Sequence, residues 1–168
     1  MGDNVAHNIQ LATNLNAIIV IEECKSAMNL DLSSLSRAIQ SLEAALRVVD
    51  DRSWFDAQRS DVQQTLIAGV VQNFEFVYEL CIKMIRRRLE IDAASPSEID
   101  FGNFRDMMRT AAEKGLITDV EAWFGYRQLR NMTAHTYNVA KAQQVCQRAR
   151  DLLIDAQAVL RALDMRNV

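Results

Sequence analysis

A long periodic segment at residues 57–91 constrains the fold of this chain more than any other feature. Apolar residues recur along it at steps of three and four, which is the spacing of one face of an α-helix. The segment carries two such stripes, so the helix should be covered on two sides. It is therefore either the central helix of a bundle or a helix whose second stripe forms a subunit interface. The first stripe contains Leu66, Val70, Phe74, Val77, Cys81 and Met84, and the second contains Ile67, Val71, Tyr78, Ile82 and Ile85.

Three further periodic segments predict the other long helices. Apolar residues between positions 35 and 49 alternate steps of four and three, and Ser33 or Ser34 can cap that helix. Residues 118–121, Thr-Asp-Val-Glu, have the pattern of a capping box and predict the start of another helix. A last helix is expected from about Val139. Its buried face contains Val145, Ala149, Leu152, Ala156, Val159 and Leu163.

A short helix is expected between the long ones. Asn103 can cap it, and Gly115 supplies the left-handed residue that ends it after Lys114. Residues 95–98 also resemble a helix start, but Gly102 soon interrupts them, so this stretch is expected to be a connector. The predicted fold class is all-α, an antiparallel up-down four-helix bundle with one additional short helix.

The length and composition fit one helical domain. A chain of 168 residues can bury a core without disulfides or metal, and one proline and five glycines suit long helices better than a turn-rich sandwich. We expect the bundle to span residues 31–168, preceded by an extension of uncertain structure at residues 1–30. Within that extension, the apolar run at residues 17–21 could form a helix on the bundle or an edge strand.

Cysteine usage and charge bear on the compartment and the partners. The chain has three widely separated cysteines and only two histidines, so neither a disulfide framework nor a zinc site is favoured. The run at residues 17–21 follows no basic region and is far shorter than the ~20 residues of a membrane-spanning helix. We therefore expect a cytoplasmic protein that enters no membrane and needs no metal or other cofactor. The net charge of −3 argues against a domain that is basic overall, but it leaves a local RNA-binding patch open.

Residues 130–137, Arg-Asn-Met-Thr-Ala-His-Thr-Tyr, gather groups suited to phosphate chemistry. Arg130 can hold a phosphate through two hydrogen bonds, and His135 can exchange a proton at cellular pH. On an ideal helix Arg127, Asn131 and His135 share one face, whereas Arg130 and His135 lie about 140° apart. They converge only if the helix ends or loosens after Asn131, or if a second subunit brings its own copy of the motif alongside.

The chain resembles a known family at this motif and at three stretches before it. These are residues 72–80, Gln-Asn-Phe-Glu-Phe-Val-Tyr-Glu-Leu, residues 115–117, Gly-Leu-Ile, and Trp123. Together they are similar to HEPN domains, and more closely to the branch called nucleotidyltransferase substrate-binding proteins, from about Met28 to the C-terminus. Many members have a Pro-Arg pair at the start of the short third helix, whereas Phe104 precedes Arg105 here.

The resemblance implies a mechanism and partners. Many HEPN proteins with an intact motif are dimeric, metal-independent endoribonucleases. In that interpretation His135 assists attack of a ribose 2′-hydroxyl on the adjacent phosphate or protonates the leaving oxygen, Arg130 stabilises the phosphorane and Asn131 orients neighbouring groups. The resemblance also implies a minimal nucleotidyltransferase partner, which in toxin–antitoxin pairs adds AMP to the tyrosine after the histidine. That residue is Tyr137 here, although such a phenol can also simply pack on the bundle end.

Other residues near the motif allow a supporting role or a purely structural one. Glu75 and Glu79 could pair with Arg127 or Arg130, or face water with Glu79 bridging Lys83. The basic run at residues 86–88 could contact RNA or complement the helix dipole. Trp123 and Phe124 are most simply core residues, with base stacking as the lesser option.

Two other functions remain open from the sequence. The protein could be a non-enzymatic subunit that binds a nucleotide or phosphorylated substrate for the transferase, or a structural dimer whose motif bonds across the interface.

Overall fold

The described part of the chain folds as a bundle of helices. The computed structural model describes residues 29–94, 102–133 and 139–167, and no strand occurs within these ranges. The predicted all-α bundle of four long helices and one short one is confirmed, and a four-residue helix that was not predicted joins them. The helices are α2 (Ser33–Asp50), α3 (Arg52–Phe55), α4 (Ser60–Asp92), α5 (Phe104–Glu113), α6 (Val120–Thr133) and α7 (Val139–Asp164).

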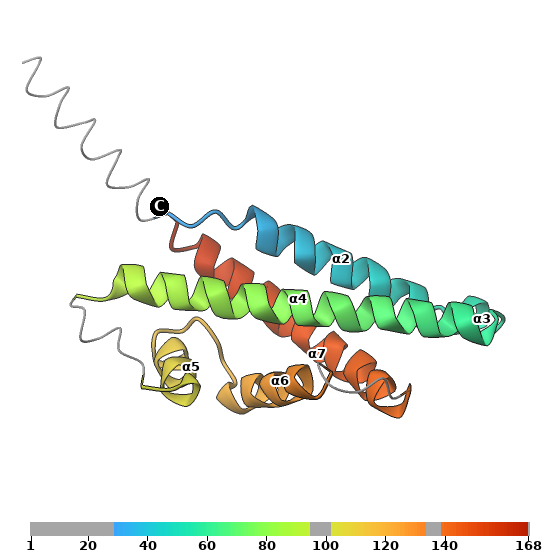
Figure 1. The fold of residues 1–168 in the computed structure, drawn as a ribbon. Helices are drawn as coiled ribbons and strands as arrows, with labels where there is room; N and C mark the ends of the chain where they lie inside the picture. Colours follow the sequence, from blue (N-terminus) through green and yellow to red (C-terminus); the bar gives the residue numbers. More distant parts are fainter. Residues whose placement is uncertain (1–28, 95–101, 134–138, 168) are drawn as a thin grey trace, which may run out of the picture.

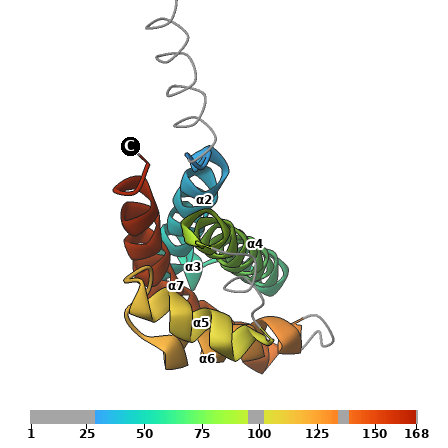
Figure 2. The same cartoon turned by 90° about the vertical axis from the view of Figure 1, so that its left-hand side faces the viewer.

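The four long helices run up and down in chain order. α4 runs along the whole bundle, with α2 and α7 packed on one side of it and α5 and α6 on another (Figure 1). Seen from one end, α2, α4 and α7 form a triangle, and α5 and α6 lie below it (Figure 2). The predicted central helix is thus α4, which contacts each of the other long helices.

α4 is central because one face of it is buried along most of its length. Val70, Phe74, Val77 and Cys81 of the first predicted stripe are fully buried, whereas Leu66 and Met84 at its ends are partly buried. α4 is also long and apolar enough to cross a membrane by length and composition alone, a property that the core helix of a bundle shares. The expectation that the chain enters no membrane stays a prediction.

The ends of α5 have the predicted chemistry. The side chain of Asn103 accepts a hydrogen bond from the Asp106 amide at 3.0 Å and so caps the N-terminus. Gly115, with φ of 69°, ends the helix. The amides of Gly115 and Leu116 donate to the carbonyls of Ala112 and Ala111, which is the Schellman arrangement.

The predicted caps of two other helices are wrong. α2 begins at Ser33, and neither predicted serine caps it. Instead, the carboxylate of Asp31 accepts a hydrogen bond from the Ser33 amide at 2.9 Å. α6 is capped by Asp119 rather than Thr118, since the Asp119 carboxylate accepts from the Ala122 amide at 3.1 Å. In both cases a carboxylate stands at or before the cap position and accepts the amide hydrogen bond in place of the hydroxyl.

Aromatic packing holds α6 against α4. Trp123 and Tyr126 of α6 are almost fully buried and contact Tyr78 and Phe74 of α4, respectively, with ring centroids 6.4 Å apart in each pair. The Tyr126 hydroxyl also donates to the Asp155 carboxylate of α7 at 2.6 Å. Trp123 is therefore a core residue, as predicted, and it fixes the helix that carries the motif.

Some predictions concern residues that the structure does not describe. These are nearly all of the extension at residues 1–30, including the apolar run at residues 17–21, the connector start at residues 95–98, and the segment with His135 and Tyr137. The domain boundary at residue 31 therefore stays a prediction, as do the roles of the two motif residues.

Candidate functional site

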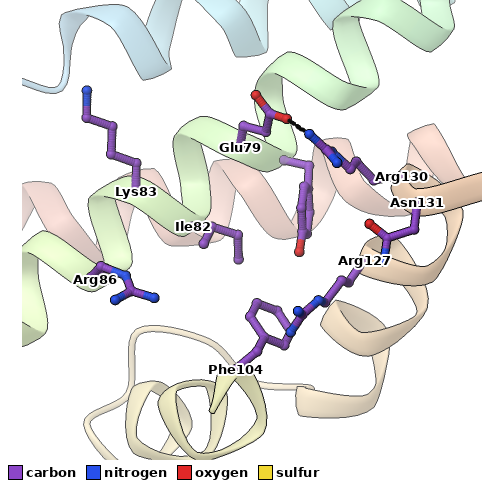
Figure 3. Close-up of a pocket in the computed structure, with 9 residues that line it drawn as sticks. Glu79, Ile82, Lys83, Arg86, Phe104, Arg127, Arg130 and Asn131 are labelled. Atoms are coloured by element: carbon purple, nitrogen blue, oxygen red, sulfur yellow. Dashed lines mark hydrogen bonds and ion pairs between the residues drawn. The ribbon is translucent and has the colours of Figure 1, made fainter. Parts of the chain in front are cut away.

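An open groove of about 480 Å³ lies where α4, α5 and α6 meet (Figure 3). α4 and α6 supply most of its walls, and Phe104 at the start of α5 closes one end. Its lining is rich in cations, although the whole chain has a net charge of −3. The lining residues are Tyr78, Glu79, Ile82, Lys83, Arg86, Phe104, Arg127, Arg130 and Asn131.

Helical periodicity explains why these side chains gather. On α4 the lining residues follow one another at steps of one and three, so they form a strip beside the buried face. On α6, Arg127, Arg130 and Asn131 are spaced three and four apart and face the same groove. The second stripe predicted for α4 partly lines this groove through Tyr78 and Ile82, so a subunit interface is not needed to explain those two residues.

Arg130 is held by an ion pair across the groove. Its Nε and Nη2 atoms donate to one carboxylate oxygen of Glu79, at 3.0 and 2.5 Å. These hydrogen bonds raise the pKa of Arg130. The negative charge of Glu75, which lies one helical turn before Glu79 on α4, also raises it. Both partners are substantially exposed, at 40% and 51% of their side chains, so the pair is weak enough for a phosphate to compete with it.

Arg127, on the same helix as Arg130, points toward the start of α5 and stacks on an aromatic ring (Figure 3). Its guanidinium carbon is 4.2 Å from the centroid of the Phe104 ring, within the range of a cation–π contact. The stack fixes the guanidinium while leaving the arginine exposed. Phe104, where the sequence differs from the family's usual proline, thus orients one of the site's cations.

The basic run at residues 86–88 divides into three different environments. Arg86 lines the groove, and Arg87 is exposed with a contact of 3.7 Å to Glu90. Arg88 is buried, pairs with Asp92 and donates to the carbonyl of Arg166 at 3.3 Å. The interpretation of this run as one RNA-binding patch is therefore wrong for Arg88, because its buried guanidinium binds groups of the protein itself.

The structure brings together most of the predicted site residues that it describes. Arg127, Arg130 and Asn131 converge, and Glu79 pairs with Arg130 rather than with Lys83. α6 ends at Thr133, directly before the segment that holds His135 and Tyr137, which lies outside the described residues.

Sequence reasoning did not assign Phe104, Lys83 and Tyr78 to the site. A signal for the two α4 residues was present, because their spacing puts them on the helix face that carries Glu79. Phe104 has no such signal, since α5 and α6 are separate elements whose relative placement only the fold determines.

Carboxylate and cysteine side chains, which can bind metal ions, occur in the described ranges. No group of three or more histidine, cysteine, aspartate or glutamate side chains there is placed to hold a metal ion. The expectation of a metal-free site stays a prediction to be tested with a chelator.

The fold and the groove define a class of protein: an up-down helical bundle with a cationic surface at the end of its third long helix. Residues 30–166 match the family described as "Nucleotidyltransferase substrate binding protein like". This chain belongs to the nucleotidyltransferase substrate-binding protein family, the branch of HEPN domains that it resembles in sequence.

Two relatives agree with this assignment. A protein of Haemophilus influenzae named "Probable ribonuclease HepT" is 46% identical over 138 residues, which cover 82% of this chain and 94% of that protein. A solved structure from the same organism has a TM-score of 0.75 and 45% identity, covering 80% of this chain and 99% of the other. Its description is the fold of a substrate binding domain of a nucleotidyltransferase.

Proposed function

We propose that this protein is a metal-independent endoribonuclease that works as a homodimer and is the toxin-like partner of a minimal nucleotidyltransferase. The observation that carries the proposal is the convergence of Arg127, Arg130 and Asn131 on one groove, directly before the segment that contains His135. Family membership and the relative named a probable ribonuclease support it.

The charge of the groove suits a phosphodiester. Among the described residues that line it, Lys83, Arg86, Arg127 and Arg130 are cations and Glu79 alone is a carboxylate, so their summed charge is positive. Arginines can hold phosphate oxygens through paired, charge-assisted hydrogen bonds, and clustered cations also attract the RNA backbone at long range. The groove therefore offers a local basic surface on an acidic protein.

The proposed reaction is a transesterification within the RNA. The imidazole of His135 accepts the proton of a ribose 2′-hydroxyl, and the 2′-oxygen attacks the adjacent phosphorus. The bond from phosphorus to the 5′-oxygen then breaks, the leaving oxygen takes up a proton, and a 2′,3′-cyclic phosphate remains. Arg130 stabilises the charge that develops on the phosphorane, and Asn131 orients the neighbouring groups.

A homodimer is part of the proposal, as the resemblance to HEPN proteins implies. Arg130 and His135 would lie about 140° apart on a continuous helix, so they reach one phosphate either because α6 ends at Thr133, before His135, or because a second protomer brings its own motif alongside. A two-fold axis near the end of α6 would place the motifs of two protomers side by side and so double every functional group. The proposal includes a cytoplasmic location, where RNA and ATP are both present.

The proposed regulation is adenylylation of Tyr137 by the partner transferase. The phenol oxygen would attack the α-phosphorus of ATP, the bond to the β-phosphate would break, and pyrophosphate would leave with the phenol proton passing to solvent. The attached AMP would bring bulk and negative charge to the motif, where the RNA phosphate should bind. Modification would therefore stop cleavage.

A second candidate is a non-enzymatic subunit that binds a nucleotide for the transferase. The description of the solved relative as a substrate binding domain favours it. The ion pair between Arg130 and Glu79 also fits it, because a nucleotide phosphate could replace the Glu79 carboxylate without any chemical step. Both candidates need the same groove, and they differ in whether His135 transfers a proton.

Cleavage of RNA in the presence of a chelator tests the proposal. The protein is first shown by mass spectrometry to carry no AMP, and wild type is compared with His135→Ala. We expect the wild type to leave 2′,3′-cyclic phosphate ends and the variant to be slower by about 10²- to 10⁴-fold. An unmodified wild type that binds RNA but leaves it intact would refute the nuclease and favour the binding subunit.

A further inference from the structure

A second groove of about 360 Å³ continues from the first along α5 and α6. The two grooves share Phe104, Arg127 and Asn131, so a ligand bound in one can extend into the other. No carboxylate is among the described residues that line the second groove. Its lining residues are Asn103, Phe104, Arg105, Phe124, Arg127, Gln128 and Asn131.

Four flat groups stand in series along this second groove. The Arg127 guanidinium lies 4.2 Å from the Phe104 ring centroid, and the Phe104 and Phe124 rings lie 6.0 Å apart at 56°. The Arg105 guanidinium lies 4.5 Å from the Phe124 ring centroid. Both arginines are exposed, whereas both rings are only partly buried. The series therefore ends at each side in a guanidinium plane that faces solvent.

Exposed guanidinium planes and aromatic faces are the surfaces on which unpaired RNA bases stack. Gln128 and Asn131 stand three residues apart on α6, so their side-chain amides lie on the same helix face and border this groove. Each amide can both donate and accept hydrogen bonds, as the edge of a base requires. The groove thus combines stacking, cations and adaptable polar groups.

We infer that the second groove is a base-binding subsite for single-stranded RNA, which holds the nucleotide next to the phosphate bound in the first groove. This inference rests on the proposed function, because it takes the first groove to hold an RNA phosphate. Arg127 lines both grooves and joins the two subsites. A phosphate alone would use the cations of this groove but would gain nothing from its rings.

Binding of two matched oligomers tests this subsite. The first probe is a fluorescent 2′-O-methyl hexa-adenylate, which the proposed reaction cannot cleave, and the second is a 2′-O-methyl hexamer of the same charge without bases. Wild type should bind the base-bearing probe about five-fold or more tightly than the abasic one. Phe104→Leu keeps the apolar packing and the charges, and should remove most of the difference in affinity between the two probes.

Two arginines of α5 give a matched pair of charge variants. Arg105→Gln should weaken binding of the base-bearing probe, because the guanidinium of Arg105 ends the series of stacked groups. Arg109→Gln removes the same charge from the same helix, but Arg109 lines neither groove, so it should leave affinity nearly unchanged. Thermal unfolding of each variant shows that the fold is intact.

The outcomes separate this inference from the proposed function. Equal binding of both probes by wild type, or an equal loss of both with Phe104→Leu, would overturn the base subsite while leaving the phosphate groove in place. Failure of wild type to bind either probe would overturn the subsite together with the function on which it rests. Loss of base-dependent affinity in Phe104→Leu and Arg105→Gln, with Arg109→Gln unaffected, would support it.

Discussion

The guanidinium of Arg130 on α6 donates two hydrogen bonds to a single carboxylate oxygen of Glu79 on α4, at 3.0 and 2.5 Å (Figure 3). The two residues are far apart in sequence and meet only because α6 packs against α4. The carboxylate thereby occupies the donors that a phosphate would use. Glu79 holds the arginine in place in the free protein, and under the proposed function it would compete with an RNA phosphate for it.

Removal of this competitor should strengthen RNA binding. Glu79→Gln frees the donors of Arg130 and removes a negative charge from the groove, so the Kd for a 2′-O-methyl RNA should fall by about two- to five-fold. Fluorescence anisotropy at fixed salt measures this change. Glu43→Gln is the matched control, because Glu43 forms an exposed ion pair with Arg47 on α2, away from the groove. Weaker binding by Glu79→Gln would show that Glu79 supports the ligand instead of competing with it.

The three adjacent arginines of α4 should respond differently to substitution by methionine. Arg88→Met breaks the bonds to Asp92 and to the Arg166 carbonyl, and should lower the free energy of unfolding by about 2–3 kcal/mol in urea. Arg87→Met, at an exposed position, should change it by less than about 0.5 kcal/mol.

The third arginine variant should change the affinity for RNA, not the stability of the fold. Arg86→Met should weaken RNA binding and reduce the slope of log affinity against log salt by about one, because Arg86 lines the groove. An unchanged slope for Arg86→Met, or an equal change for Arg87→Met, would contradict the placement of the phosphate in this groove.

Stability at alkaline pH should depend on Tyr78. Burial raises the pKa of this tyrosine to about 12 from its ordinary value of 10.0, although Arg127 and Arg130 act against the shift. Between these two values the unfolded chain loses the phenol proton while the folded protein keeps it, so stability is full below about pH 10 and falls as pH rises toward 12.

Urea unfolding between pH 9 and 11.5 measures this effect. Tyr78→Phe should make the decline in the free energy of unfolding less steep than in wild type, by up to about 1.4 kcal/mol per pH unit. Identical slopes in the two proteins would show that the hydroxyl of Tyr78 reaches solvent in the folded state.

Periodicity in the sequence was sufficient to predict the long helices and their buried faces. Val70, Phe74 and Val77 are buried on α4, and Leu152 and Val159 are buried on α7, at the positions that the spacing of three and four indicates. Such spacing determines which side of a helix is apolar before any tertiary contact is known. The helix caps were less predictable, because serine or threonine and aspartate both suit a cap and stand within two residues of each other at both starts.

The candidate site was predictable only in part. Arg127, Arg130 and Asn131 follow from the motif and from helical spacing, because all three belong to one helix. The ion pair with Glu79 could be named only as one of several options, since it depends on how α4 and α6 are placed against each other. The contact between Arg127 and Phe104 was not predicted, because a cation–π pair between separate helices leaves no local pattern in the sequence.

The most direct test measures RNA cleavage by unmodified protein in which residue 130 either loses its positive charge or keeps that charge without the guanidinium group. RNA cleavage in chelator is compared for wild type, Arg130→Ala and Arg130→Lys, alongside the thermal unfolding of each. We predict that Arg130→Ala loses about 10²- to 10³-fold in rate and Arg130→Lys at least about ten-fold, with little change in stability, because the exposed pair with Glu79 contributes little to the fold. Full cleavage by Arg130→Ala, or a loss of stability without a loss of rate, would contradict the account.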